Sequence, residues 1–267
     1  MKEIPFVKYH GAGNDFVLID NRAGEYNLSE KEIQKICDRH FGIGSDGLIL
    51  LEKANDFDFK MVFYNPDAST DMMCGNGGRC IVAFAQSLGV INNKASFLAP
   101  DGKHTAEILD KQGNKYIVKL SLLDVKEIKE LQDGQFLYIG TPHFVKVVDN
   151  LETLDLKDKG SLIRYDKRFE RTQGSNANFI EIVKDGEINI RTYERGVEDE
   201  TLACGTGITA SAIAYSEKYN PKTNPITINS KGGKLKVYFT KNESNTYSNI
   251  FLEGEAEKVF EGKIILD

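Results

Sequence analysis

The chain has 267 residues, of which 40% are hydrophobic and 28% are charged, a balance typical of soluble globular proteins long enough for two domains. Its formal net charge of −6 argues against a nucleic-acid-binding face, which requires clustered basic residues. No apolar run approaches the roughly 18 residues of a membrane span, the N-terminus lacks a signal-like apolar core, and no cysteine or histidine spacing suggests a metal site. We therefore expect a cytoplasmic protein with reduced cysteines and no nucleic-acid, membrane or metal partner.

The first half of the chain reads as short strands interrupted by two helices. A strand at 6–9 leads through a glycine-rich turn at 10–15 into a second apolar run at 16–19. Ser29 and Glu32 have the spacing of a capping box, which predicts a helix with Ile33, Ile36 and Cys37 buried on one face. Alternation and turn signals predict further strands at 48–51, 57–64, 95–98, 103–109 and 116–120.

Two cysteine loops stand out from this background. Segment 70–80 (TDMMCGNGGRC) places Cys74 before a glycine cluster, and an apolar run at 81–88 follows at once. Segment 201–207 (TLACGTG) places Cys204 in the same position before the run at 208–215. Each pattern predicts a helix that begins at the cysteine, with Cys80 buried inside the first one.

The second half repeats the order of the first. Residues 136–145 echo the strand, glycine turn and Phe-Val pattern of 6–17, with Phe16 matching Phe144 at an offset of 128. The two cysteines lie 204 − 74 = 130 positions apart, so two independent echoes predict a duplicated unit. We place an N-terminal domain at 1–122 and a C-terminal domain at 123–255. Further strands are predicted at 178–183, 187–193, 226–229, 233–239, 250–253 and 255–260, with the second helix ended by Asn220 and Pro221.

A cysteine at a helix start has a chemical meaning. The unpaired N–H groups and the dipole at a helix N-terminus stabilise a thiolate, and the same amides can hold a carboxylate. Two such loops on opposite faces of one ligand could remove a proton from a carbon and return one from the other side, which inverts the stereocentre. The alternatives that the residues leave open are a redox dithiol and a protein that binds amino acids without catalysis.

Other polar residues near these loops are candidates for ligand contacts. Glu194 and Arg195 lie just before the second loop, where they form either a surface ion pair or a contact for ammonium and carboxylate groups. His143 is either a scaffold residue or a site residue, and Arg79 is either a surface charge or a ligand contact. Asn14, Asn65 and Asn176 are predicted in turns, where asparagine is also common for backbone reasons.

In combination, these motifs resemble the diaminopimelate epimerase family of pyridoxal-independent two-cysteine epimerases. The resemblance covers nearly the whole chain. It rests on HGAGNDF at 10–16, NPD at 65–67, the Cys74 loop, Pro142 with His143, Asn176 with Phe179, and YERG at 193–196 with the Cys204 loop. It implies an α+β fold of two pseudo-symmetric domains, each a curled, barrel-like and mostly antiparallel sheet around a central helix. It also implies an active site in the interdomain cleft and a C-terminal strand, about 256–267, that rejoins the first domain.

The resemblance further implies an isomerase of lysine biosynthesis that interconverts LL- and meso-diaminopimelate without a cofactor, and a homodimer. Cys74 and Cys204 would be the acid/base thiols. The implied substrate-binding residues are Asn14, Asn65, Gly75, Asn76, Asn176, Glu194, Arg195, Gly205 and Thr206, with Thr141 and His143 in support.

Two positions depart from the family pattern. Many members have asparagine where Thr141 stands, and some have glutamine where Gly47 stands. Both differences bear on recognition of the distal end of the substrate and leave the proton chemistry unchanged. The alternative within the fold is a two-cysteine racemase of another amino acid, such as histidine or a proline derivative, although Asn76 differs from the first loop of proline-racemase relatives.

Overall fold

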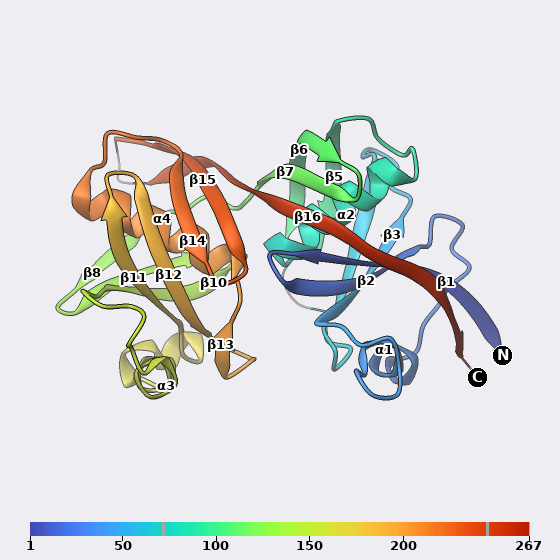
Figure 1. Cartoon of the computed structure of the whole chain (residues 1–267), viewed down its shortest axis with the longest axis horizontal. Helices are drawn as coiled ribbons and strands as arrows, with labels where there is room; N and C mark the ends of the chain where they lie inside the picture. The colour runs from blue at the N-terminus through green and yellow to red at the C-terminus, as the bar shows by residue number, and fades with distance from the viewer. Residues whose placement is uncertain (71–72, 244–245, 267) are drawn as a thin grey trace. The chain divides into compact units, whose positions relative to one another are not determined.

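The computed structural model describes residues 1–70, 73–243 and 246–266, and the chain divides into two compact units (Figure 1). Unit 1 comprises Met1–Leu120 and Gly254–Asp267, and unit 2 comprises Ser121–Glu253. Each unit has its own curled sheet and its own buried helix. No helix among the described residues is long and apolar enough to cross a membrane.

Unit 1 is a ring of strands around one helix. The strands follow the order β1-β2-β3-β4-β5-β6-β7-β16, and β16 also pairs with β1, which closes the ring. The pairs β2–β3 and β4–β5 are parallel, and the other pairs are antiparallel. Its elements are β1 (Lys2–Gly11), β2 (Asn14–Asp20), α1 (Glu30–Cys37), β3 (Gly47–Glu52), β4 (Phe59–Tyr64), α2 (Gly75–Ser87), β5 (Lys94–Ala99), β6 (Gly102–Gln112) and β7 (Lys115–Ser121).

Helix α2 occupies the interior of this ring. Every residue from Gly75 to Ala85 is buried, and the helix contacts β1, β2, β3 and β6. A helix that is buried on all sides cannot be amphipathic, which explains the unbroken apolar run after Cys80. Helix α1 is different, because it carries the predicted capping box at Ser29 and buries one face, which includes Cys37.

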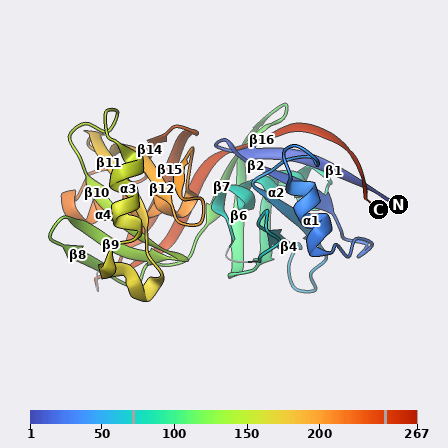
Figure 2. The same ribbon diagram turned by 90° about the horizontal axis from the view of Figure 1, so that it is seen from below.

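Unit 2 has a related arrangement around helix α4, in which the strands follow the path β8-β9-β10-β11-β12-β14-β15-β16 (Figure 2). The short strand β13 pairs with β12 beside this path. Its elements are β8 (Ile128–Leu131), β9 (Gly134–Ile139), β10 (Thr141–Val147), α3 (Leu156–Arg164), η1 (Lys167–Thr172), β11 (Asn176–Lys184), β12 (Glu187–Glu194), β13 (Asp199–Thr201), α4 (Gly205–Tyr219), β14 (Ile226–Ser230), β15 (Gly233–Lys241) and β16 (Tyr247–Leu266).

The pairing pattern confirms the duplication predicted from the sequence. In unit 1, β2 pairs antiparallel with the strand before it and parallel with β3. In unit 2, β10 pairs antiparallel with β9 and parallel with β11. Phe16 and Phe144, which we matched by sequence, both lie on these equivalent strands. The expected α+β fold of two pseudo-symmetric, mostly antiparallel sheets is therefore confirmed.

Two expectations about the elements were wrong, and some elements were not predicted. The predicted strands at 250–253 and 255–260 form one continuous strand, β16, whose first part belongs to unit 2 and whose remainder belongs to unit 1. Asn14 and Asn176 begin strands β2 and β11 and do not lie in turns. Helix α3 and strand β8 were not predicted, because only Leu156, Gly160 and Ile163 of that charged helix are buried and β8 has four residues, none of which is buried.

Candidate active site

Each unit has one helix that begins directly after a cysteine. Cys74 is the N-cap residue of α2 and Cys204 is the N-cap residue of α4, and both have extended backbone angles. The first helical hydrogen bonds run from Gly78 N to Cys74 O and from Ile208 N to Cys204 O, at 2.8 Å each. The backbone N–H groups of the three preceding helical residues therefore have no partner within either helix and can bind an anion at its end.

Glycines in the first turn of each helix allow close packing around the helix ends. A Cβ atom on Gly207 would lie 2.5 Å from Asn178 Oδ1 and 3.3 Å from Cys204 Sγ. A Cβ atom on Gly78 would lie 2.6 Å from Leu120 Cδ2. Carbon atoms normally approach no closer than about 3.5 Å, so larger residues at these two positions would displace the surrounding side chains. Cys37, Cys74, Cys80 and Cys204 all lie within the described residues, and none of them forms a disulfide.

In unit 1, Asn14 brings the Cys74 thiol together with polar side chains of α2. Cys74 Sγ lies 3.4 Å from Asn14 Oδ1, and Asn76 Nδ2 donates to the same oxygen at 3.1 Å. Asn76 Oδ1 accepts a hydrogen bond of 2.9 Å from the guanidinium of Arg79. Arg79 is fully buried, and it also donates to two backbone carbonyl oxygens. The structure therefore assigns Arg79, which the sequence left undecided, to the interior as the support of Asn76.

Behind Asn14 lies a network of charged side chains that sequence reasoning missed. Asn14 Nδ2 donates to Asp46 Oδ2 at 2.7 Å, and Arg39 bridges Asp46 and Asp15 at 2.7 and 2.8 Å. Lys8 also forms an ion pair with Asp15. Although burial opposes it, the hydrogen bonds from Arg39 and Lys8 lower the pKa of Asp15 to about 2. Asp46 lies 32 positions from Asn14, and no local pattern links the two residues.

In unit 2, a chain of close polar contacts runs from a buried histidine to the start of α4. His143 Nε2 lies 2.9 Å from Thr141 Oγ1, which is 3.5 Å from Thr206 Oγ1. Thr206 Oγ1 lies 3.6 Å from Cys204 Sγ, and Asn176 Nδ2 lies 3.4 Å from Thr141 Oγ1. The structure therefore brings together five of the residues that the sequence singled out in this half of the chain.

Asn178, which was not among the predicted residues, sets the tautomer of His143. Asn178 Nδ2 donates to Phe144 O at 3.0 Å and lies 3.2 Å from His143 Nδ1. Because the amide nitrogen can only donate, Nδ1 accepts, and the ring proton lies on Nε2, facing Thr141. Burial, with a smaller contribution from the charge of Arg195, lowers the pKa of His143 to about 3, so the imidazole is neutral near pH 7. An asparagine inside a strand is uncommon, and this was the one sequence signal for Asn178.

Asn176 and Arg195 are joined through backbone groups. Asn176 Oδ1 accepts from Arg195 N at 2.8 Å, and Asn176 Nδ2 donates to Pro142 O at 2.9 Å. The Arg195 guanidinium donates to Thr172 O at 3.0 Å. Asn176 therefore ties the strand that carries Thr141 to the turn that follows β12.

Two further predicted residues, Asn65 and Glu194, are placed by hydroxyl-bearing neighbours. Asn65 follows β4, and its Nδ2 donates to Ser69 Oγ at 3.0 Å within one turn. Glu194 ends β12, and its Oε2 accepts from Thr201 Oγ1 at 2.7 Å. These two hydrogen bonds join residues that are 4 and 7 positions apart in the sequence.

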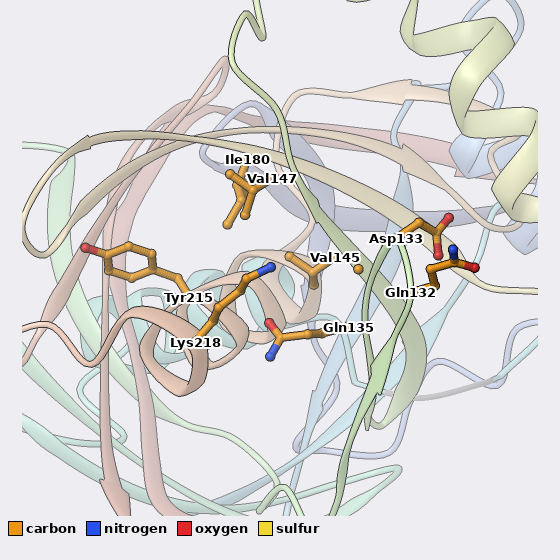
Figure 3. A pocket seen from close by; sticks show the side chains of 9 residues that line it. Gln132, Asp133, Gln135, Val145, Val147, Ile180, Tyr215 and Lys218 are labelled. Carbon is orange, nitrogen blue, oxygen red and sulfur yellow. The ribbon is translucent and has the colours of Figure 1, made fainter.

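Unit 2 also contains a cavity of about 160 Å³ that is distinct from the start of α4 (Figure 3). It lies against the last turns of this helix at Tyr215 and Lys218, and against Gln135, Val145 and Ile180 of the sheet. Gly205 and Lys218 are 13 positions apart on a helix that rises about 1.5 Å per residue, which separates the cavity from Cys204 by roughly 20 Å. Within the described ranges, no group of three or more metal-binding side chains is arranged to hold an ion.

Comparison with known proteins identifies relatives of full length. The family model described as diaminopimelate epimerase matches residues 6–121 and 135–259. A protein named diaminopimelate epimerase from Flavobacterium psychrophilum is 50% identical over 258 residues, which cover 96% of this chain and 98% of that protein. A protein of the same name from Aquifex aeolicus is 39% identical, with 97% of each chain covered.

Solved structures of more distant proteins share the fold. A phenazine biosynthesis protein of the PhzF family from Bacillus anthracis has a TM-score of 0.76 at 15% identity and covers 100% of both chains. A hydroxyproline epimerase from Agrobacterium vitis has a TM-score of 0.71 at 14% identity and covers 99% of this chain and 91% of its own. At these identities the likeness describes the arrangement of the elements alone.

Proposed function

Because the chain belongs to the diaminopimelate epimerase family, we propose that it interconverts LL- and meso-diaminopimelate, with Cys74 and Cys204 as its two acid/base thiols. The observation that carries this proposal is the repeated cysteine at the start of a buried helix, once in each half of a duplicated fold. The activity is that of an isomerase and belongs to lysine biosynthesis.

The proposed reaction uses each helix end in two ways. One sulfur, as thiolate, removes the α-proton, and the other, as thiol, delivers a proton to the opposite face of the carbon. The backbone amides of Gly75, Asn76, Gly205 and Thr206 hold the neighbouring carboxylate and stabilise the negative charge that develops on it during deprotonation. Atoms balance, because one proton leaves the carbon and one returns, and the two sulfurs exchange their protonation states.

The side chains beside the two sulfurs favour different protonation states of Cys74 and Cys204 in the resting enzyme. Cys74 Sγ faces Asn14 Oδ1, which can only accept, so this contact favours the protonated thiol. Cys204 Sγ faces the hydroxyl of Thr206, which can donate and so can stabilise a thiolate. We infer that Cys74 begins as the acid and Cys204 as the base.

The remaining polar residues are proposed to bind the substrate. Asn14, Asn65, Asn176, Glu194 and Arg195 would contact its amino and carboxylate groups, with Thr141 and His143 in support. The hydrogen that His143 donates to Thr141 leaves the hydroxyl hydrogen of Thr141 able to point toward a ligand.

The absence of a side chain at position 47, where some relatives have glutamine, has a local cause. A Cβ atom on Gly47 would lie 2.7 Å from Phe63 Cε2 and 2.9 Å from Tyr64 O. Any larger residue would therefore require β3 and β4 to shift.

Proton exchange with solvent tests the proposal directly. In deuterated water the protein should place deuterium at the α-carbon of diaminopimelate while it interconverts the isomers. Cys74→Ser and Cys204→Ser should each lower turnover by roughly 10²- to 10⁴-fold, whereas Cys37→Ser, which alters a cysteine on α1, should not. Exchange with histidine or a proline derivative, and none with diaminopimelate, would replace the proposed substrate. Near-normal turnover in either of the first two variants would refute the two-thiol mechanism.

We further propose a cytoplasmic homodimer. Four described cysteines without a disulfide suit a reducing compartment, and fractionation of cells that express the protein would test this. Sedimentation equilibrium should give twice the chain mass of 29.9 kDa. A monomeric mass at micromolar concentration would contradict the dimer and leave the proposed chemistry unaffected.

A further inference from the structure

Asp46 lies in the loop before β3, at the back of the Asn14 side chain. One oxygen, Asp46 Oδ2, accepts from Asn14 Nδ2 at 2.7 Å and from Asp15 N at 3.2 Å. The other oxygen accepts from Arg39 at 2.7 Å. The loop itself is anchored, because Asp46 N donates to Asp15 O at 2.9 Å. The carboxylate is therefore held in one orientation by three donors besides its own backbone bond.

This contact decides which end of the Asn14 amide faces the cysteine. A carboxylate only accepts hydrogen bonds, so the amide nitrogen of Asn14 must face Asp46, and the amide oxygen must face the other way. A second anchor gives the same answer. Arg79 only donates and occupies Asn76 Oδ1, so Asn76 presents its nitrogen to Asn14 Oδ1. Asp46 thus fixes the nitrogen of the Asn14 amide directly, and Arg79 fixes its oxygen through Asn76. This oxygen lies 3.4 Å from Cys74 Sγ.

We propose that Asp46 is a positioning residue, which locks the Asn14 amide so that an oxygen acceptor always faces the Cys74 sulfur. Asp46 would keep Cys74 protonated until the reaction requires its proton. The inference rests on the proposed acid/base role of Cys74, and it does not depend on which amino acid is the substrate.

The other titratable groups near this end of α2 do not provide the same control. Arg79 and Cys80 of α2 are fully buried and interact electrostatically with Cys74. The Arg79 cation favours a thiolate at Cys74, so an acceptor at Asn14 is needed to oppose it. Asp15 is neutralised by its ion pairs with Lys8 and Arg39. Asp46 is the carboxylate that contacts Asn14 directly.

Replacing Asp46 by asparagine should reverse the polarity of the contact. Arg39 still needs an acceptor, so the new amide directs its oxygen to Arg39 and its nitrogen to Asn14. Asn76 Nδ2, held by Arg79, still requires an acceptor, so the Asn14 amide is no longer fixed in one orientation and its nitrogen can also turn toward Cys74, where it stabilises the thiolate. Asp46→Ala removes the acceptor without adding a donor, so its effect should be intermediate. Asp20→Asn is the matched control, because Asp20 also pairs with an arginine in unit 1 but does so at the far end of β2.

The test is the pH dependence of alkylation by iodoacetamide, followed for each cysteine-containing peptide by mass spectrometry. For Cys74, the pH of half-maximal rate should fall by about one unit or more in Asp46→Asn and by less in Asp46→Ala. It should not change in Asp20→Asn, and the profile of Cys204 should not change in any variant. Circular dichroism should show the native fold throughout, since Asp46 is a half-exposed loop residue.

Turnover gives a second readout. If the enzyme acts on diaminopimelate, Asp46→Asn should lower kcat by about tenfold or more, with a smaller change in KM, and the alkaline limb of its pH profile should move to lower pH. An unchanged Cys74 alkylation profile in the folded Asp46 variants would overturn the proposal. A shifted profile in a protein that does not exchange diaminopimelate would sustain the role of Asp46 while refuting the proposed substrate.

Discussion

The buried imidazole of His143 should make unit 2 sensitive to acid. Its side chain is 0% exposed, and burial lowers its pKa from 6.5 to about 3. The unfolded chain binds a proton near pH 6.5, whereas the folded protein does not bind one until about pH 3. Below pH 6.5 the unfolded state therefore holds more protons, and the free energy of unfolding falls as the pH falls. The stabilisation is fully present above pH 6.5 and is lost progressively down to about pH 3.

The size of the effect follows from the same shift. Each pH unit within this window costs about 1.4 kcal/mol, so moving from about pH 7.5 to about pH 5 crosses roughly 1.5 units of the window and costs about 2 kcal/mol. Urea unfolding at the two pH values, in the wild type and in His143→Gln, isolates this contribution from other titrating groups. Because the two units can unfold separately, hydrogen exchange of the β10 and β11 amides is the more direct measurement.

The prediction is tested by comparing how steeply the free energy of unfolding changes with pH in the wild type and in the variants. His143→Gln should be less stable near neutral pH but should lose about 2 kcal/mol less than the wild type on acidification. His40→Gln removes an exposed imidazole of unit 1 and should leave the slope of unit 2 unchanged. Equal slopes in the wild type and His143→Gln would mean that His143 takes up its proton at the same pH in the folded and unfolded states, which would refute the lowered pKa.

Two other substitutions test the packing of the helices. Arg79→Met should destabilise unit 1 by roughly 2–4 kcal/mol in chemical denaturation, because three acceptors lose a charged hydrogen-bond donor. Removal of a buried cation offsets part of this loss. A variant as stable as the wild type would show that these hydrogen bonds contribute little. Gly160→Ala should destabilise unit 2 by roughly 1–3 kcal/mol, because the new methyl group would lie 2.3 Å from Tyr193 Cβ, although alanine has the better helix propensity. A stabilised variant would mean that α3 can move away from β12 at little cost.

Features that depend on neighbouring residues could be predicted from the sequence. The helix starts at Cys74 and Cys204, the capping box at Ser29 and the burial of Cys37 all follow from patterns within a few residues, and the structure contains them. The duplication was also visible, because the same local pattern occurs twice at nearly one offset.

Features that depend on long-range pairing could not be predicted. Asp46 meets Asn14 because β2 and β3 are parallel neighbours, and the sequence contains no signal for that pairing. Arg79 was undecided for a related reason. A charged residue on a helix is usually exposed, and only the closed ring of unit 1 puts this one in the interior. Asn178 likewise reaches His143 because β10 and β11 are parallel neighbours, and this pairing also has no signal in the sequence.

Equivalent positions of the duplicated fold carry different side chains near the two cysteines. In unit 2, His143 pairs with Asn176 across the parallel strands β10 and β11. At the same place in unit 1, Asp46 N donates to Asp15 O beside β2 and β3. The same pair of positions is therefore Asp15 and Asp46 in the unit of Cys74, and His143 and Asn176 in the unit of Cys204.

The proposed two-thiol reaction begins with one sulfur protonated and the other deprotonated. If both helix ends had kept the same neighbours, each helix dipole would stabilise a thiolate to the same degree, and the two sulfurs would hold the single proton equally well. The fixed oxygen of Asn14 beside Cys74 and the rotatable hydroxyl of Thr206 beside Cys204 break this equivalence. Duplication would then account for the positions of the two thiols, and divergence of the side chains around them would account for their opposite roles.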